Sequence, residues 1–209
     1  ERLKSMIETR PDWCVSRQRV WGVPLPIFIS KKDEKVLVDE EVFNNIANIF
    51  EKEGSDCWFE NNKQKFLGKK YNENDFYQTT DIVEVWFDSG STHSFVLEQR
   101  EDLKWPASLY LEGSDQHRGW FHSSLLESCG TRGEAPFEAI LSHGFVVDGK
   151  GLKMSKSLGN VIAPEDILKK YGADILRIWV AASNYAEDLR IDHKILEQHA
   201  DAYRKLRNT

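Results

Sequence analysis

A short polar loop carries the side chains best suited to bind a polyphosphate. Residues 153–157 read Lys-Met-Ser-Lys-Ser, so two ammonium groups lie three positions apart and two hydroxyls accompany them. Gly149 and Gly151 precede the loop, which predicts that it can move. Such a loop can close over a polyphosphate and supply positive charge while a phosphoryl bond breaks. A solvated basic turn is the alternative, but the whole pentapeptide coincides with the flanking glycines, and this favours phosphate binding.

A second phosphate-binding pattern overlaps this region and is rejected. Residues 144–150 have the Gly-x-x-x-x-Gly-Lys spacing of a Walker loop, but Gly151 stands where that motif requires Ser or Thr to hold magnesium. The segment also reads as a strand that runs into a glycine turn, with no helix opening directly after it. Without a helix N-terminus the backbone lacks a cradle for the phosphates, so we expect no P-loop here.

Strand and helix patterns alternate from residue 81 onward. Apolar runs predict strands at 107–111, 139–141 and 145–147. Helices are predicted at 120–129, 164–171, 173–182 and from about 194 onward. The first is ended by Gly130 and carries the apolar residues Trp120, Phe121, Leu125, Leu126 and Cys129. The second begins with Pro164 and has Lys169 and Lys170 in its last turn. The alternation predicts an α/β fold with a mostly parallel sheet, whose ligands bind beyond the carboxyl ends of the strands.

Residues 30–80 differ in character from the segments on either side. Residues 11–29 are rich in Trp, Arg and Pro, whereas 30–80 begin with a charged run and contain several Asn residues. Within 30–80, apolar residues recur at helical spacing at Val42, Phe43, Ile46, Ile49 and Phe50. We therefore predict a small inserted module at 30–80, carried on a main sheet formed by 1–29 and 81–185, and a separate charged helical region at 186–209.

The composition excludes several classes of protein. The 209 residues include 28 Lys and Arg against 34 Asp and Glu, a net charge of −6, so nucleic acid can be contacted only through local patches. No apolar run approaches the roughly 20 residues of a membrane span. The scattered Cys14, Cys57 and Cys129 argue against a disulfide framework and a zinc site, and they indicate a reducing cytosol. Because the sequence begins with Glu1 rather than Met, we expect a fragment.

Four motifs together resemble the class I aminoacyl-tRNA synthetases, and within them the bacterial isoleucine-specific group. The motifs are Lys153–Ser157, Leu111–Phe121 (Leu-Glu-Gly-Ser-Asp-Gln-His-Arg-Gly-Trp-Phe), Trp13–Gly22 (Trp-Cys-Val-Ser-Arg-Gln-Arg-Val-Trp-Gly) and Trp86–Gly90 (Trp-Phe-Asp-Ser-Gly). The resemblance covers nearly the whole chain and is weakest in residues 30–80. Valine- and leucine-specific relatives share the 153–157 loop and the beginning of the 13–22 stretch, but not the 113–121 run.

The resemblance implies an ATP-dependent ligase that acts in the cytoplasm. Isoleucine would react with ATP, which binds with Mg²⁺, to form isoleucyl-adenylate and pyrophosphate, and the isoleucyl group would then be transferred to tRNA(Ile). No membrane partner and no zinc site in this part of the enzyme are expected. The chain would supply the second half of a Rossmann-like parallel sheet at 1–29 and 81–185 and the start of an anticodon-binding helical region at 186–209. The family's His-x-Gly-His signature is absent from all 209 residues. The remainder of the polypeptide is therefore expected as a partner, and the chain alone is expected to be inactive.

The resemblance also implies roles for individual residues. Lys153 and Lys156 would be catalytic, and Glu112 would accept hydrogen bonds from the ribose hydroxyls. The residues implied at the ATP or adenylate are Glu112, Gly113, Asp115, Gln116, His143, Val147, Met154, Ser155, Lys156 and Ser157. Trp86 and Trp120 would flank the isoleucine side chain, although a Trp on an apolar helix face is more often core. Arg17 and Arg19 would meet the tRNA acceptor end, although a basic turn can equally be ion-paired surface.

Two other functions stay open. A valine-specific enzyme fits the loop and the 13–22 stretch, but the 113–121 run disfavours it. A non-catalytic tRNA-binding module derived from a synthetase is a different class of protein, which has no need of both the intact 153–157 loop and Glu112.

Overall fold

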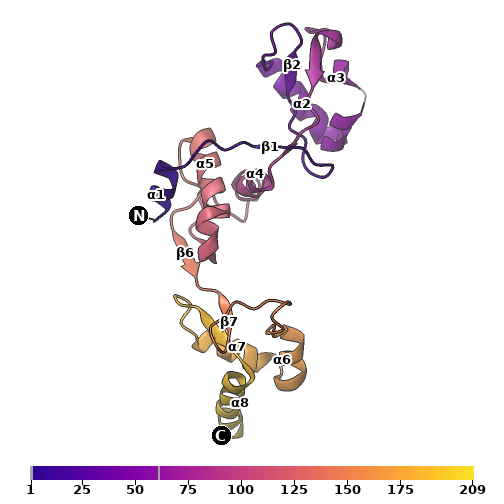
Figure 1. Cartoon of the computed structure of the whole chain (residues 1–209). Helices are drawn as coiled ribbons and strands as arrows, with labels where there is room; N and C mark the ends of the chain where they lie inside the picture. Colours follow the sequence, from indigo (N-terminus) through magenta and orange to yellow (C-terminus); the bar gives the residue numbers. More distant parts are fainter. Residues whose placement is uncertain (1, 61) are drawn as a thin grey trace. The chain divides into compact units, whose positions relative to one another are not determined.

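A computed structural model describes residues 2–60 and 62–209 of the chain (Figure 1). The chain forms two compact units. Unit 1 comprises Glu1–Trp105 and Gly119–Pro136, and unit 2 comprises Pro106–Arg118 and Phe137–Thr209. The predicted α/β class is confirmed, because helices accompany paired strands in both units.

Unit 1 contains the antiparallel strand pairs. Its elements are α1 (Arg2–Glu8), β1 (Ser16–Arg17), β2 (Phe28–Ser30), α2 (Glu40–Glu53), η1 (Ser55–Phe59), α3 (Lys63–Leu67), η2 (Glu73–Asp75), β3 (Phe76–Gln78), β4 (Ile82–Val83), α4 (Val85–Gly90), η3 (His93–Leu97) and α5 (Trp120–Arg132). Strand β1 pairs with β4 and β2 pairs with β3, both antiparallel. The expected parallel arrangement is therefore not found among these strands.

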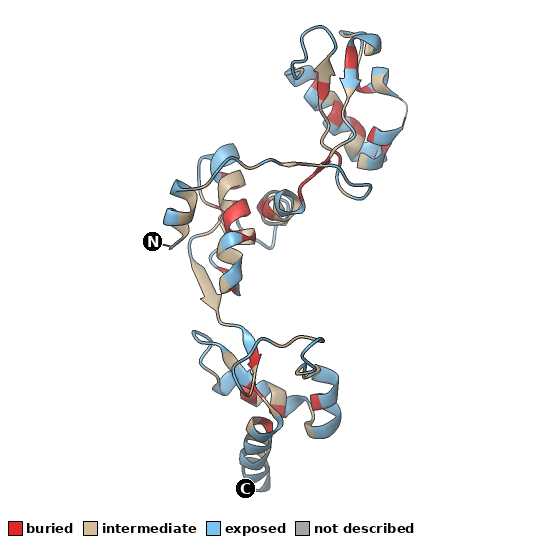
Figure 2. Cartoon of the chain, viewed as in Figure 1, coloured by how far each residue is buried: buried red, intermediate tan, exposed pale blue. Residues whose placement is uncertain are grey.

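Residues 28–76 of unit 1 enclose a core of their own (Figure 2). Trp58 is fully buried at its centre, and its indole N–H donates to the carbonyl of Thr79 at 2.8 Å. Helix α2 lies where the spacing predicted it and buries Val42, Ile46 and Ile49, but Phe43 is 42% exposed because it lies on the flank of the buried stripe. The predicted boundaries of the 30–80 module stay a prediction.

Helix α5 departs from the sequence-based prediction in its end and in its buried face. It continues through Gly130 to Arg132, and Gly133, with a φ of +75°, forms a left-handed cap after its end. The buried face carries Phe121, Ser124 and Ser128, while Cys129 is exposed. Helix α4 approaches α5 at Gly90, where an added Cβ would lie 2.9 Å from the Ser123 hydroxyl, so small polar residues share the buried face with Phe121.

Unit 2 contains the parallel strands and the polar loop. Its elements are β5 (Tyr110–Gly113), η4 (Ser114–Arg118), β6 (Ile140–His143), β7 (Val146–Asp148), α6 (Pro164–Tyr171), α7 (Ala173–Ala182), β8 (Leu189–Ile191) and α8 (His193–Asn208). Strand β5 pairs with β6 and β7 pairs with β8, both parallel. Pro164 begins α6 as predicted, and α6, α7 and α8 bury Ile167, Trp179 and Leu196 between them.

The turn from β6 to β7 requires a glycine because another backbone segment passes beside it. The N–H of Gly144 donates to the carbonyl of Tyr185 at 2.9 Å, and a Cβ at Gly144 would overlap the carbonyl group of Glu187. Close approach of two backbones leaves no flexible side chain that could move aside. Position 144 therefore tolerates no side chain without a shift of residues 187–188.

We predict that Gly144→Ala lowers the free energy of unfolding of the chain by about 1–3 kcal/mol, since the added methyl group forces one backbone segment away. Urea unfolding followed by circular dichroism measures this change. Gly130→Ala is the control, because nothing lies within 4 Å of a Cβ at Gly130 inside helix α5. Alanine there should raise stability by up to about 1 kcal/mol. Equal stability of the Gly144→Ala variant and the parent chain would contradict the prediction.

Candidate functional site

The polar loop begins at Asp148, the last residue of β7. The Asp148 carboxylate accepts hydrogen bonds from the backbone N–H groups of Lys150 at 2.9 Å and Leu152 at 2.8 Å. Its other oxygen accepts from the side-chain amide of Asn160 at 2.9 Å. The hydrogen bond from Asn160, followed by that from the Leu152 amide, holds the pKa of the Asp148 carboxyl below its usual value. Asp148 therefore ties the start of the loop to residue 160 at its far end.

Asn160 uses both ends of its amide inside the loop. Its oxygen accepts from the backbone N–H of Ser155 at 2.9 Å, and its nitrogen also donates to the carbonyl of Lys153 at 3.3 Å. Between these two residues, Met154 packs against the core of unit 2. We call the Asp148 and Asn160 side chains, with these hydrogen bonds, the loop clamp.

The sequence did not indicate the loop clamp. A carboxylate at a strand end before a Gly-x-Gly turn is a typical signal for side-chain bonds to the next backbone amides. That signal could have identified Asp148. It could not have identified Asn160 as the partner, because periodicity says nothing about side chains twelve residues apart.

The two lysines of the loop project into solvent. Lys153 and Lys156 are exposed, and within residues 2–60 and 62–209 neither ammonium group makes an ion pair or hydrogen bond. The hydroxyls of Ser155 and Ser157 lie 3.1 Å apart, and the Ser155 hydroxyl accepts from the N–H of Leu158 at 3.2 Å. The loop thus has an internally bonded backbone and two ammonium groups that are available to an anion.

The carboxyl ends of β5 and β6 bring together a second group of predicted site residues. In the parallel register, Glu112 lies opposite Ser142 and Gly113 lies opposite His143. Gly113 is buried, and a Cβ placed there would lie 2.6 Å from the Asp115 carboxylate and 3.8 Å from the His143 ring. Glycine therefore lets Asp115 and His143 approach the same strand end.

His143, Gln116 and Val147, all predicted for the nucleotide site, make specific contacts within unit 2. The Nδ1 atom of His143 donates to the carbonyl of Gly144 at 2.8 Å, which places the proton of the neutral ring on Nδ1. The side-chain amide of Gln116 donates to Asp115 at 3.3 Å. Val147 is buried beneath the loop, where it forms an antiparallel bridge to Lys153.

The two tryptophans predicted for the amino-acid side chain lie in unit 1. Trp86 on α4 is 42% exposed, and its backbone N–H donates to the Glu84 carboxylate at 3.1 Å. Trp120, half-buried, begins α5, and its indole N–H donates to the carbonyl of Ser89 at 2.9 Å. Neither indole is fully buried, so both could contact a ligand of unit 1.

The predicted tRNA-contacting arginines also lie in unit 1 and differ in their contacts. The Arg17 guanidinium donates to the carbonyls of Cys14 and Ser16 at 2.6 and 2.8 Å, which holds it against its own backbone. Arg19 is exposed beside Trp21, whose side chain is 92% exposed. Both arginines line a cavity of about 740 Å³ that extends to residues 82–85 and Asp88.

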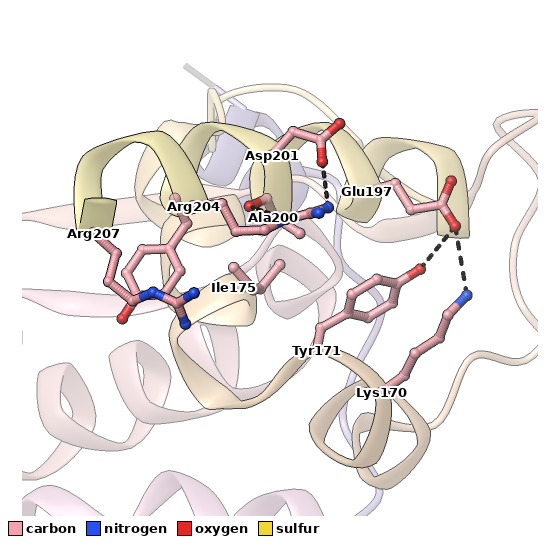
Figure 3. A pocket seen from close by; sticks show the side chains of 9 residues that line it. Lys170, Tyr171, Ile175, Glu197, Ala200, Asp201, Arg204 and Arg207 are labelled. Carbon is pink, nitrogen blue, oxygen red and sulfur yellow. Dashed lines mark hydrogen bonds and ion pairs between the residues drawn. The ribbon is translucent and has the colours of Figure 1, made fainter. Parts of the chain in front are cut away.

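A cavity in unit 2 lies outside the predicted site (Figure 3). It measures about 550 Å³ and is lined by residues of α6, α7 and α8. The Glu197 carboxylate accepts from the Tyr171 hydroxyl at 3.3 Å and pairs with Lys170 at 3.5 Å, and Arg204 pairs with Asp201. Much of the charge around this cavity is therefore already neutralised within the helices.

Two carboxyl groups of unit 1 lie where α4 packs against α5. Burial, with the nearby Asp88 carboxylate as the smaller cause, raises the pKa of Glu127 to about 8. Burial and the Glu84 carboxylate likewise raise the pKa of Asp88 above its usual value. One oxygen of Glu127 is buried without a hydrogen-bond partner, which is consistent with a neutral group at pH 7.

Two further properties concern the described residues only. No group of three or more His, Cys, Asp or Glu side chains there is placed to hold a metal ion. No helix in the described part has the length and apolar character needed to cross a membrane.

Comparisons with known proteins give consistent matches. The model of the family "tRNA synthetases class I (I, L, M and V)" matches residues 1–192. An isoleucine–tRNA ligase of Pelagibacter ubique is 79% identical over 209 residues, all of this chain and 23% of that protein. An isoleucine–tRNA ligase of Brucella abortus is 58% identical over all of this chain and 21% of that protein. The chain thus spans between a fifth and a quarter of the length of these relatives.

A solved structure shares the fold. The LeuRS of Agrobacterium radiobacter K84, in a ternary complex with tRNA and LeuAMS, matches with a TM-score of 0.68 over 99% of this chain and 30% of that chain. The sequence identity is 20%, so this likeness concerns the fold alone.

We predict that Glu127 makes a contribution to the free energy of unfolding that falls as the pH rises from about 4.5 to about 8. Its folded-state pKa is raised, so the unfolded state releases the proton first, and the stability contribution present at low pH is lost as the pH passes through this window. Urea unfolding across the window measures the slope. The Glu127→Gln variant, which keeps the neutral shape, lacks this contribution, so its free energy of unfolding should fall less, or rise more, across the window than that of the parent chain. An unchanged pH dependence would contradict the raised pKa.

Proposed function

Since the chain belongs to the class I tRNA synthetase family, as the match over residues 1–192 shows, we propose that it is part of an isoleucine–tRNA ligase. The observation that carries the proposal is 79% identity, over the whole chain, to a protein of that name. The enzyme would transfer the adenylyl group of ATP to the isoleucine carboxylate and release pyrophosphate, and would then pass the isoleucyl group to tRNA(Ile) and release AMP. It would work in the cytoplasm with the remainder of the same polypeptide.

The loop at 153–157 would bind the ATP phosphates, which arrive with Mg²⁺ as part of the substrate. The isoleucine carboxylate would attack the α-phosphorus, and the bond to the pyrophosphate oxygen would break. Negative charge then grows on the departing phosphates, where Lys153 and Lys156 would supply compensating positive charge. Their ammonium groups are exposed and have no partner among the described residues, which supports these roles because no ion pair there has to break before a phosphate binds.

The strand ends of β5 and β6 would hold the nucleoside part of ATP or the adenylate. Glu112 would accept from the ribose hydroxyls, with Gly113, Asp115, Gln116 and His143 around it. Ligands of parallel sheets bind beyond the carboxyl ends of the strands, where these residues lie. Buried Val147 would support the loop from beneath, together with Met154, Ser155 and Ser157 as parts of the loop itself.

Two residue pairs of unit 1 would contact the other substrates. Trp86 and Trp120 would flank the isoleucine side chain, and their partial exposure supports this role. Arg19 would contact the tRNA acceptor end from its exposed loop, with Arg17 beside it. The two relatives named above are isoleucine–tRNA ligases, which disfavours the valine-specific alternative.

The test uses this chain in place of the matching segment of the Pelagibacter ubique relative, which we call the graft enzyme. The graft enzyme should catalyse isoleucine-dependent ATP–pyrophosphate exchange, and an inactive but folded graft would contradict the proposed function. We predict that Lys156→Ala in the graft enzyme lowers kcat by about 100- to 1000-fold with a much smaller change in the ATP KM, because the contact forms mainly in the transition state.

Lys169→Ala is the matched control, since Lys169 is exposed on α6 and lies outside the loop. It should leave both kcat and the ATP KM unchanged. Exchange by Lys156→Ala within about threefold of the parent graft would remove the role assigned to Lys156.

We further predict that the 209-residue chain by itself does not catalyse the exchange. Catalytic groups must surround one phosphorus atom, and a misplacement of about 1 Å can cost about a hundredfold in rate. The chain spans 23% of the Pelagibacter ubique relative and does not contain the His-x-Gly-His signature, so it does not supply all of the catalytic groups. The test is pyrophosphate exchange with the purified chain, and the graft enzyme is the positive control. Exchange by the chain alone would show that the catalytic groups are misassigned.

A further inference from the structure

We propose that Asp148 and Asn160, the loop clamp, are positioning residues that place Lys153 and Lys156 for the transfer of the adenylyl group. The inference rests on the proposed function for the chemical step, but the geometry of the loop clamp stands on its own. Neither residue would touch the substrate. Each would act by fixing the backbone from which a lysine side chain extends.

The hydrogen bonds of the loop clamp lie on both sides of Met154. The Asn160 side chain accepts from the N–H of Ser155 at 2.9 Å and donates to the carbonyl of Lys153 at 3.3 Å. Met154 itself packs against the core formed by α6, α7 and α8. The backbone of residues 153–155 is thus held by two polar contacts and one apolar contact, which leaves the Lys153 side chain as the mobile part.

Lys156 is held by the turn that follows. The N–H of Gly159 donates to the carbonyl of Lys156 at 3.2 Å, and the Ser155 hydroxyl accepts from the N–H of Leu158 at 3.2 Å. This turn leads directly to Asn160, whose amide donates to Asp148 at 2.9 Å. Release of Asn160 would therefore free the turn around Lys156 and the segment around Lys153 together.

The two side chains of the loop clamp have complementary chemistry. Asp148 accepts three N–H groups, from Lys150, Leu152 and Asn160, which suits a carboxylate with two free oxygens. Asn160 both donates and accepts, which suits an amide. An Asp at 160 would lose the donor and place a second carboxylate against Asp148, whereas an Asn at 148 facing an Asp at 160 would restore the bond between them.

A positioning role predicts a change in rate rather than in binding. The ammonium groups are exposed and make no contact with the loop clamp, so loss of the clamp leaves their charge intact. A bound ATP would still meet two lysines, but their average position around the α-phosphorus would be less defined. Displacement on the order of 1 Å costs about a hundredfold in rate, so kcat should fall while the ATP KM stays nearly constant.

The experiment compares four variants of the graft enzyme by pyrophosphate exchange and by hydrogen–deuterium exchange of peptides that cover residues 149–160. The variants are Asn160→Asp, Asp148→Asn, the double swap Asp148→Asn with Asn160→Asp, and the control Asn72→Asp, whose side chain caps a turn in unit 1. Asn160→Asp should lower kcat by about 10- to 100-fold and speed deuterium uptake in the loop peptides. The double swap restores the hydrogen bond between positions 148 and 160 but not the donor to the Lys153 carbonyl, so it should recover part of both losses, and the control should change neither.

Three results would overturn the proposal. The first is unchanged deuterium uptake in 149–160 in the Asn160→Asp variant. The second is a loss of kcat in the double swap as large as the product of the losses in the two single variants. The third is a loss that appears in the ATP KM rather than in kcat. If the parent graft enzyme is folded but inactive, the proposed function fails, and deuterium uptake in the loop still decides whether the clamp holds the backbone.

Discussion

The parallel pairing of β7 with β8 determines the arrangement of most of unit 2. Parallel strands cannot be joined by a tight turn, so the chain from Asp148 to Leu189 must leave the sheet and return. That connection consists of the 153–157 loop, α6 and α7, and α8 follows the second strand. Because Asp148 lies opposite Ile191, the start of the loop and the start of α8 lie side by side.

This register brings Gly149, just before the loop, into close contact with Asp192, which caps α8. Asp192 accepts from the N–H of Ile195 at 2.8 Å and thereby caps α8, and a Cβ at Gly149 would overlap the same Asp192 side chain. Gly149 is therefore needed for close approach, which differs from the freedom of movement that the sequence suggested for it. The glycine brings the loop against the helix cap, and the loop clamp then fixes the residues that follow.

Local signals in the sequence predicted the elements whose cause is local. Pro164 and the last-turn lysines gave α6, and the recurring apolar residues gave α2, because caps and periodicity act within a few turns. The buried face of α5 and the partnership of Asp148 with Asn160 depend on residues far apart along the chain, and no pattern in the sequence identifies such partners. The exposed lysines were identified as site candidates through a motif, and the structure adds that, in the part of the chain it describes, their ammonium groups have no partner.

The contrast between Lys170 and Lys156 explains why a loop held by amide and backbone hydrogen bonds suits phosphate binding. Lys170 pairs with Glu197 at 3.5 Å, so an incoming anion would compete with a carboxylate already present. The loop clamp contains one carboxylate, and backbone N–H groups and the Asn160 amide occupy it, so it neutralises neither lysine. If ion pairs fixed the loop, its ammonium groups would be neutralised by carboxylates and would not be available to a phosphate. Fixation through hydrogen bonds to the backbone orders the loop and leaves both ammonium groups available.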